Sequence, residues 1–537
     1  MTDKKKQYLY VRLPIFVALA LTIGILIGAK MFAKKNTESV DSASSKLKDI
    51  LINIDEYYVD SVNTNEIAER AIKEMLSQLD PHTSYIPAKD LKEANSRLIG
   101  NFDGIGIEFN IFRDTIVVLK TMEGSPAQAE GLQAGDQIIA VDDKSVVTDS
   151  LNYDHVHQKL KGESGTKVLV TVLRKKQPLK ITITRGKIPL YTVDVSYMVD
   201  AKTGYLKINR FGAKTYEEFK EALEKMIQSG MKQLVLDLRD NPGGYMSAAI
   251  KIIDEFLEGE KLVVYTKSKN TQFDEKYHCE TKGLFEKGNL IVLIDENSAS
   301  ASEIVSGSLQ DHDRAWIVGR RSFGKGLVQR PIDLKDGSEL RLTISRYYTP
   351  SGRCIQKPYE KGKNDEYMNE YYNRSHAELY HADSVKLDKS VPYKTTKGRV
   401  VYGGGGVMPD SFVSLDTMYL TKFLNQIYAK SALTVFALRY ALAHEKEWRS
   451  KTLTDFENKF VVNESILKDF LKLLAQVNIE FKPTEYERSK AWIMNEIKAD
   501  IAKFFWKEEG YYRISNQADS VFQQSLRLFD KAESLNK

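Results

Sequence analysis

The sequence predicts an α+β protein built from several domains, and three observations lead to this prediction. The chain has 537 residues, well beyond the roughly 250–300 residues at which a single hydrophobic core stops growing. Apolar residues follow a helical spacing before Phe102 and a strand-like alternation after it. Strands then alternate with helices from Gly204, as in an α/β domain, and beyond Phe412 the pattern is helical again.

The bulk composition argues against several classes of function. Lys and Arg total 78 and Asp and Glu total 73, an excess too small for the basic surface that nucleic-acid binding needs, so nucleic acid is not expected as a partner. The two cysteines, Cys279 and Cys354, cannot build a disulfide framework or a Cys-rich zinc site. They could pair with each other, but we expect free thiols. The eight histidines include no HExxH motif, and no metal or organic cofactor is implied.

The N-terminal segment, residues 1–35, carries one apolar run. Leu13–Ala29 is an uncharged stretch of 17 residues between Arg12 and Lys30. A membrane-spanning helix needs about 20 residues, and the two flanking bases can snorkel to cover the shortfall. A cleaved signal peptide is the alternative, but no clear small-x-small cleavage site follows the run. We therefore expect a single-pass anchor in the cell membrane, with the rest of the chain on the extracytoplasmic (periplasmic) side.

Residues 36–101 are predicted to be a small helical region. Asn36–Ser45 is polar and rich in serine, which is typical of a short tether. Three helices are predicted by apolar residues at three-to-four spacing, at Leu47–Val59, Asn65–Leu79 and Lys89–Leu98. Asp80-Pro81 is expected to end the second helix, because a residue that precedes proline avoids the helical conformation.

Residues 102–187 are predicted to form a small β-barrel. Alternation indicates strands near Ile105–Phe109, Ile116–Val118, Gln137–Val141, Lys167–Leu173 and Leu179–Thr184, with one helix beginning near Tyr153. The segment Gly104-Ile105-Gly106-Ile107 is a glycine-spaced loop that runs into a strand, and the strings GSPA and GLQAGD follow it. In these features the region resembles a PDZ domain. Such a loop can direct backbone N–H groups at a peptide carboxylate while the strand edge accepts the peptide; a plain glycine turn is the alternative.

Residues 188–412 are predicted to form the α/β domain. Strands are expected at Gly204–Asn209, Gln233–Leu238, Asn289–Ile294, Ala315–Val318 and Leu340–Ser345, and helices at Tyr216–Ser229, Met246–Phe256 and Ser298–Leu309. A polar stretch at about 358–402, rich in Tyr and Lys, is interpreted as an insertion. Residues 413–537 are predicted to be a C-terminal helical region, with Met418–Ala443 and Glu464–Val477 as its clearest helices.

Three short stretches of the α/β domain are candidates for chemistry, namely DLRDNPGG at Asp237–Gly244, SASASE at Ser298–Glu303 and SFGKGLVQ at Ser322–Gln329. A serine is a weak nucleophile unless a base removes its proton, and a helix N-terminus adds backbone N–H groups suited to an oxyanion. No histidine pairs obviously with a serine. A lysine can replace it when burial lowers the pKa enough to leave a neutral amine, and Lys325 has apolar neighbours and flanking glycines.

These strings, together with LDPHTSYI upstream and GGVMPD at Gly405–Asp410, resemble the carboxyl-terminal processing proteases, the serine peptidases of family S41 with a PDZ domain, from about Leu47 to Asp410. The resemblance implies Ser300 as nucleophile, Lys325 as general base and Gln329 as the third member of the triad. It also implies an oxyanion hole from the N–H groups of Ala301 and of Gly243 or Gly244. The core is expected to have a ClpP/crotonase-like fold, and the PDZ domain to capture the C-termini of protein or peptide substrates.

Each candidate has a structural alternative. Ser300 and Glu303 fit a capping box, in which the serine only caps a helix, and Ser298 or Ser302 could be the exposed hydroxyl. Lys325 could be a solvated turn lysine, and the Gln329 side chain could form hydrogen bonds only with backbone groups. His312 is expected at a polar helix end, and Arg174 and Arg239 could bind a carboxylate or form salt bridges. For the whole chain, the rival hypothesis is a membrane-tethered PDZ scaffold with an inactive protease-like region, and a homo-oligomer or an adaptor protein stays open.

Overall fold

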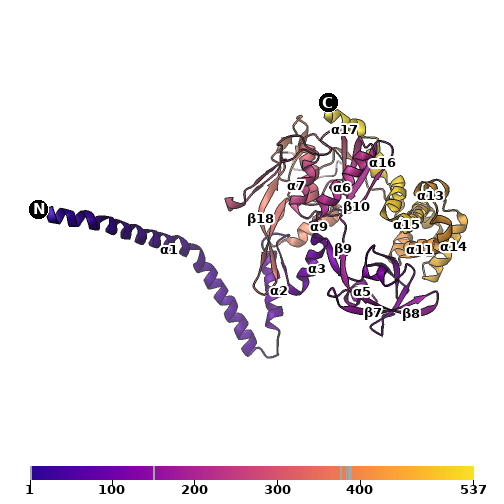
Figure 1. The fold of residues 1–537 in the computed structure, drawn as a ribbon, viewed down its shortest axis with the longest axis horizontal. Coiled ribbons are helices and arrows are strands. Elements are labelled where there is room, and N and C mark those ends of the chain that lie inside the picture. Colours follow the sequence, from indigo (N-terminus) through magenta and orange to yellow (C-terminus); the bar gives the residue numbers. More distant parts are fainter. Residues whose placement is uncertain (1–2, 149–150, 375–377, 382–383, 385–389) are drawn as a thin grey trace. The chain divides into compact units, whose positions relative to one another are not determined.

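The computed structural model describes residues 3–537 except 149–150, 375–377, 382–383 and 385–389 (Figure 1). Part of the predicted insertion therefore lies outside the described residues. The chain divides into two compact units, residues 1–78 and 79–537, and each is described by itself.

The first unit consists of α1 (Asp3–Tyr57) and α2 (Thr64–Ser77). The tether predicted at Asn36–Ser45 is wrong, because this segment is part of the continuous helix α1. It contains neither Gly nor Pro, the residues that most disfavour a helix. Every helix in the described part of the chain is too short or too polar to traverse a bilayer, so the membrane span predicted at Leu13–Ala29 is not supported.

The second unit is centred on a six-stranded sheet whose order is β10-β11-β12-β15-β16-β21. Its strands are β10 (Val193–Met198), β11 (Thr203–Ile208), β12 (Gln233–Asp237), β15 (Asn289–Ile294), β16 (Trp316–Gly319) and β21 (Ser411–Phe412). All neighbours are parallel except β10, which pairs antiparallel at one edge. The predicted α/β architecture of this region is confirmed, and the carboxyl ends of its central strands lead into the candidate stretches.

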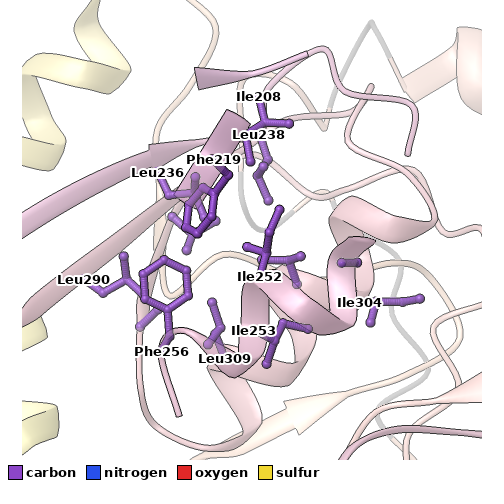
Figure 2. Packing of buried hydrophobic residues seen from close by; sticks show 14 of the residues in the cluster. Ile208, Phe219, Leu236, Leu238, Ile252, Ile253, Phe256, Leu290, Ile304 and Leu309 are labelled. Carbon is purple, nitrogen blue, oxygen red and sulfur yellow. The ribbon is translucent and has the colours of Figure 1, made fainter. Parts of the chain in front are cut away.

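Helices cover both faces of this sheet. On one face, α6 (Thr215–Gln228), α7 (Met246–Asp254) and α8 (Ala301–Asp311) bury their apolar side chains against the strands. Figure 2 shows this packing, in which Phe219, Ile252 and Leu309 meet Leu236 and Leu290 of the sheet. On the other face, α16 (Ser520–Leu526) and α17 (Phe529–Asn536) pack on alternate strand residues such as Val235 and Ile291. Because helices cover both faces of the sheet, the sequences of its strands are continuous apolar runs.

A second sheet has the order β3-β4-β5-β7-β8, with β6 (Lys144–Ser145) on β5. Its main strands are β3 (Ile107–Phe112), β4 (Thr115–Thr121), β5 (Gln137–Val141), β7 (Lys167–Arg174) and β8 (Gln177–Thr184), and α5 (Tyr153–Leu160) and α4 (Pro126–Ala129) accompany them. The predicted strands of this small domain are confirmed. β3 stands at the end of the strand order and, among the described residues, pairs with β4 alone. β2 (Asn101–Gly104) pairs with β9 (Gly186–Pro189) where the chain enters and leaves this domain.

A third sheet supports the candidate site from outside the core. It consists of β1 (Ser84–Ile86), β18 (Glu339–Tyr348), β13 (Leu262–Lys267) and β14 (Lys276–His278), and β17 (Leu327–Asp333) forms an antiparallel pair with β18. α3 (Ala88–Ile99) follows β1, and the predicted insertion contains α9 (Asn364–Arg374) and the hairpin of β19 (Pro392–Lys394) and β20 (Val400–Tyr402).

The C-terminal region is helical, as predicted, from α10 (Lys422–Ala429) through α11 (Ala432–Ala443), α12 (Glu445–Trp448), α13 (Leu453–Lys459), α14 (Glu464–Gln476) and α15 (Pro483–Ala518). The single helix predicted at Met418–Ala443 is wrong, because Ser431 has a φ of 52° and separates α10 from α11. The apolar core of these helices includes Phe112 and Val117 of the small β domain, so the two regions share a packed interface.

Candidate active site

Ser300 lies at the turn between strand β15 and helix α8. It is the N-cap residue of α8 and has a φ of 54° and a ψ of −111°. A positive φ is strained for a residue with a Cβ and persists only where surrounding structure holds it, which is common at active sites. The turn thus presents the Ser300 hydroxyl at the positive end of a helix dipole.

The other two candidate hydroxyls of the SASASE stretch are structural. Ser298 is fully buried, and its Oγ donates to the Leu238 carbonyl oxygen at 2.8 Å. Ser302 is also fully buried, and its Oγ donates to the Asn241 carbonyl oxygen at 2.9 Å. Ser300 lines a cavity of about 580 Å³. Of the three serines, only Ser300 is therefore open to a substrate.

Ser300 and Glu303 form the predicted capping box, in which the Glu303 carboxylate accepts the Ser300 N–H at 2.8 Å and the Ser300 side chain faces the Glu303 N–H. As an acceptor in this box, the hydroxyl keeps its own hydrogen, which a base can remove. Because Ser300 also lines the cavity, capping and a role as nucleophile are compatible.

Lys325 lines the same cavity as Ser300. Its side chain makes no hydrogen bond or ion pair with the described residues. Burial lowers the pKa of its amine, an effect that the negative charges of Glu303 and Asp80 oppose in part. A lysine in this setting gives up its proton more readily than one in water.

The loop that carries Lys325 is held by a complete set of backbone hydrogen bonds. The N–H groups from Ser322 to Gly326 donate in turn to Val407 O, Ser298 O, Glu303 Oε1, Glu303 Oε2 and Gln356 Oε1. The carbonyl oxygens accept in turn from Arg374 twice, the Lys357 N–H, the Tyr347 hydroxyl and the Tyr347 N–H. With every backbone group paired, the position of the Lys325 backbone is tightly defined.

Glu303 joins the two candidate loops, and the sequence analysis assigned it no role beyond capping. Its fully buried carboxylate accepts from Ser322 Oγ at 2.5 Å, from the N–H groups of Gly324 and Lys325 at 2.7 and 2.8 Å, and from Ser300. Burial raises its pKa to about 7, against the opposing effect of these donors. The Tyr347 hydroxyl adds a second link, 3.1 Å from Ser300 O and 2.7 Å from Lys325 O.

The glycine pair packs directly against the Ser300 turn. A Cβ added to Gly243 would lie 2.8 Å from Ser300 Cβ, and one added to Gly244 would lie 2.0 Å from Phe211 O. The Gly243 N–H donates to Asn241 Oδ1 at 2.9 Å, so it is already occupied. The N–H groups of Gly244 and Ala301 have no acceptor among the described residues, and the geometry therefore favours Gly244 over Gly243 as the partner of Ala301.

Gln329 lies on β17 and lines the cavity. Its Nε2 donates to Thr343 Oγ1 at 3.2 Å, and Thr343 Oγ1 donates to Asp80 Oδ1 at 3.0 Å. Within the described residues it makes no hydrogen bond to Lys325. The structure thus brings Gln329 to the site, while its observed contact is with a neighbouring strand.

His82 is a cavity residue that the sequence analysis did not single out, although it belongs to the LDPHTSYI string. Its Nε2 lies 2.9 Å from the Tyr367 hydroxyl. Burial, followed by the nearby Lys325 charge, lowers the pKa of His82 to about 3, so the ring is neutral at physiological pH. Only its position in the folded chain, which pairing of β1 with β18 fixes, distinguishes it from the other histidines.

The glycine-spaced loop Gly104–Ile107 precedes the edge strand β3 as predicted. Gly106 has a φ of 78°, and a Cβ there would lie 2.3 Å from Ser125 Cβ, so this position requires glycine. Its carbonyl oxygen accepts from Met122, and that of Ile105 accepts from Ala127. The loop is thereby fixed next to an unpaired strand edge.

The remaining candidates have structural roles. His312 caps the C-terminus of α8 and its Nε2 lies 2.7 Å from Leu262 O. Arg174 and Arg239 form ion pairs with Asp136 and Asp237, each at 2.6 Å. Both cysteines are free thiols. The described part of the chain contains no cluster of three His, Cys, Asp or Glu side chains that could hold a metal ion.

Comparison with known proteins identifies three regions of similarity. Family models match Peptidase family S41 at residues 202–362, a PDZ domain at 117–174 and a family of unknown function at 423–507. A carboxy-terminal-processing protease of Bartonella bacilliformis is 36% identical over 349 residues, which cover 64% of this chain and 79% of the relative. A probable CtpA-like serine protease of Staphylococcus aureus is 33% identical over 62% of this chain and 66% of its own length.

Solved structures give weaker matches. The match to the photosystem II D1 C-terminal processing protease covers 68% of this chain and 92% of that protein, with 23% identity and a TM-score of 0.35. The protein is a serine protease with an α/β core and a PDZ domain. It belongs to peptidase family S41 and is a homologue of the carboxy-terminal-processing proteases.

Proposed function

We propose that this protease cleaves peptide bonds by acyl transfer to Ser300 with Lys325 as general base. The observation that carries the proposal is that a serine hydroxyl and an unpaired, partly desolvated amine line one cavity at the head of α8. Neutral Lys325 would take the Ser300 proton as the hydroxyl attacks the scissile carbonyl, and the N–H groups of Ala301 and Gly244 would bind the oxyanion. Protonated Lys325 would then give this proton to the leaving amine as the peptide C–N bond breaks. The neutral amine of Lys325 would act as base again when water hydrolyses the acyl-enzyme and the proton returns to Ser300.

We further propose that the PDZ domain selects substrates by their free C-termini. The edge of β3 can accept an extended peptide as an added strand, and the fixed loop Gly104–Ile107 lies where a terminal carboxylate would end. Substrates would then be proteins or peptides with accessible, unfolded tails. Gln329 lies on the cavity wall near Lys325 and would orient its amine once substrate has displaced the contact between Gln329 and Thr343.

The pH dependence of cleavage tests the neutral-base role. Cleavage of casein by the full chain, in buffer with a chelator, is expected to rise with pH along one limb. The apparent pKa of that limb should lie below 10.5, because burial lowers the pKa of Lys325 and only the neutral amine accepts the serine proton. A rate that stays flat up to pH ~10, where free lysine titrates, would contradict the proposal.

An extracytoplasmic location is proposed from the uncharged run Leu13–Ala29 alone. The run would serve in export, whether it is retained or removed. Cell fractionation together with N-terminal sequencing of the mature protein tests this. Recovery of the intact chain only in the cytoplasmic fraction would overturn it.

A further inference from the structure

Helix α9, which belongs to the predicted insertion, turns one face toward the loop of Lys325. Tyr367, Glu370 and Arg374 are spaced three and four residues apart, so they lie on the same side of the helix. All three contact residues of the active-site region. The polar composition of the insertion and its lack of a motif predict no role for it from the sequence.

Arg374 is the strongest of these contacts. Its side chain is 3% exposed. Nη1 donates to Ser322 O at 2.8 Å and Nη2 donates to Phe323 O at 3.0 Å. These two carbonyl groups lie immediately before Gly324 and Lys325, and the guanidinium is the donor that satisfies them. A planar fork of donors suits two adjacent carbonyl oxygens better than an ammonium does.

Glu370 keeps the guanidinium in place. Its carboxylate accepts from Arg374 Nε at 2.8 Å, from Lys357 Nζ at 2.6 Å and from Arg321 Nη2 at 3.1 Å. Burial alone would raise its pKa, but Arg374 and Lys357 outweigh burial and lower it to about 2. The ammonium of Lys357 also lies 3.9 Å from the centre of the Tyr367 ring. Three cations thus share the Glu370 carboxylate, and Arg321 also pairs with Glu378 at 2.6 Å.

Tyr367 reaches the cavity wall from the same helix. It is 3% exposed, and burial raises the pKa of its hydroxyl, which therefore stays protonated. Gln356 Nε2 donates to the hydroxyl oxygen at 3.4 Å, which leaves the hydroxyl hydrogen for Nε2 of neutral His82 at 2.9 Å. His82 is thereby kept as an uncharged ring beside Lys325.

We propose that helix α9 helps to form the active site. Arg374 positions the loop that carries Lys325, and Tyr367 positions His82 beside Lys325. Neither residue touches substrate, so both are positioning residues. The inference rests on the proposed role of Lys325 as base. It assigns to the insertion the task of keeping that amine fixed and screened from water.

The pH profile separates this role from a merely structural one. The titratable or charged groups around Lys325 are Glu303 on α8, Arg341 on β18, Asp80 and His82 before β1, and Lys357. None of them is replaced when Arg374 changes. If the loop loosens and water enters, desolvation of the amine weakens and its pKa returns toward 10.5. The rising limb of the rate profile should then move to higher pH.

The experiment compares Arg374→Met, Arg374→Lys and Tyr367→Phe in the full chain, with Lys361→Met as control on an exposed side chain of the same insertion. We expect kcat for casein to fall about 10- to 100-fold in Arg374→Met, less in Arg374→Lys, and about threefold to tenfold in Tyr367→Phe, the effects of one or two lost hydrogen bonds. The rate limb should shift upward in pH with KM nearly unchanged, and Lys361→Met should match the parent.

Parent-like rates and an unshifted limb in a folded Arg374→Met would overturn the proposal. If Arg374→Met does not fold, Tyr367→Phe, which loses a single oxygen atom, decides by the same two readouts. Failure here is distinguishable from failure of the proposed function, because Ser300→Ala would remain inactive in the first case and would cleave in the second.

Discussion

Replacing Lys325 by methionine is expected to abolish cleavage and to make the folded protein more stable. The amine has no hydrogen-bond partner among the described residues, and burial lowers its pKa, so in the folded state it is costly to keep charged. Methionine has a similar length and no charge to desolvate. We expect kcat to fall by about 10⁴-fold or more, as for other nucleophile and base deletions, and the free energy of unfolding to rise by about 1 kcal/mol.

The gain in stability should depend on pH in a defined direction. A lysine whose folded pKa lies below its unfolded value of 10.5 releases its proton on folding, so the parent gains stability as pH rises between these two pKa values. The advantage of Lys325→Met is therefore largest below the folded pKa and vanishes near 10.5. Denaturant unfolding at pH 7 and at about pH 10 measures this, since unperturbed lysine titrates near the second value.

Three further variants show whether the lost activity comes from the proposed chemistry. Lys325→Arg keeps a cation that cannot deprotonate and should be as inactive as Lys325→Met. Ser300→Ala should be inactive with stability near that of the parent. Ser302→Ala changes the serine two residues after Ser300 and removes a hydrogen bond to Asn241 O. This variant should cleave at a rate within about tenfold of that of the parent. Activity in Lys325→Arg would show that the lysine does not act as a base.

Local pattern was enough to predict the strands and helices that carry the site. Asn289–Ile294 was predicted with the observed ends, because a strand covered on both faces is a continuous apolar run with a polar residue after it. The serine and lysine were predictable for a different reason. Glycines, small residues and an apolar setting concentrate around them, and the short strings resemble those of a known family.

Residue spacing does not predict contacts between residues that lie far apart in the sequence. The sequence predicts Glu303 as part of a helix cap, but its carboxylate also accepts hydrogen bonds from the Lys325 loop, about twenty residues further along the chain. His82 and Tyr367 lie 285 positions apart and meet only because β1 pairs with β18 and α9 folds back over the loop. The oxyanion candidates were left as Gly243 or Gly244, and only the hydrogen bond from Gly243 to Asn241 distinguishes them. Such contacts follow from tertiary packing.

Glu303 gives the second large expected effect. Replacing it by glutamine keeps the shape of the side chain, yet we expect the free energy of unfolding to fall by about 2–4 kcal/mol, because buried donors are left unpaired. Each carboxylate oxygen accepts two donors, Ser322 Oγ and the Gly324 N–H on Oε1, and the N–H groups of Ser300 and Lys325 on Oε2. Whichever way the amide is turned, its NH₂ group faces two N–H or O–H donors.

Activity should fall with stability in Glu303→Gln, because the carboxylate is what ties the Ser300 turn to the Lys325 loop; we expect a loss of about 100-fold in kcat, as for a misplacement of about 1 Å. The pH dependence should change as well. Because the folded pKa of Glu303 is raised from 4.5 to about 7, the folded state holds a proton that the unfolded state has lost, and the stability of the parent declines as pH rises through this window.

Glutamine does not titrate, so the variant should lose that slope between these pH values. Glu217→Gln, on an exposed position of α6, is the matched control and should keep the slope, the stability and the rate of the parent. Urea unfolding at pH 5 and pH 8, with casein cleavage measured on the same samples, checks both effects. A Glu303→Gln protein with the stability and kcat of the parent would mean that the two loops hold their relative position without the buried carboxylate, and that pre-organisation of the serine and lysine has another source.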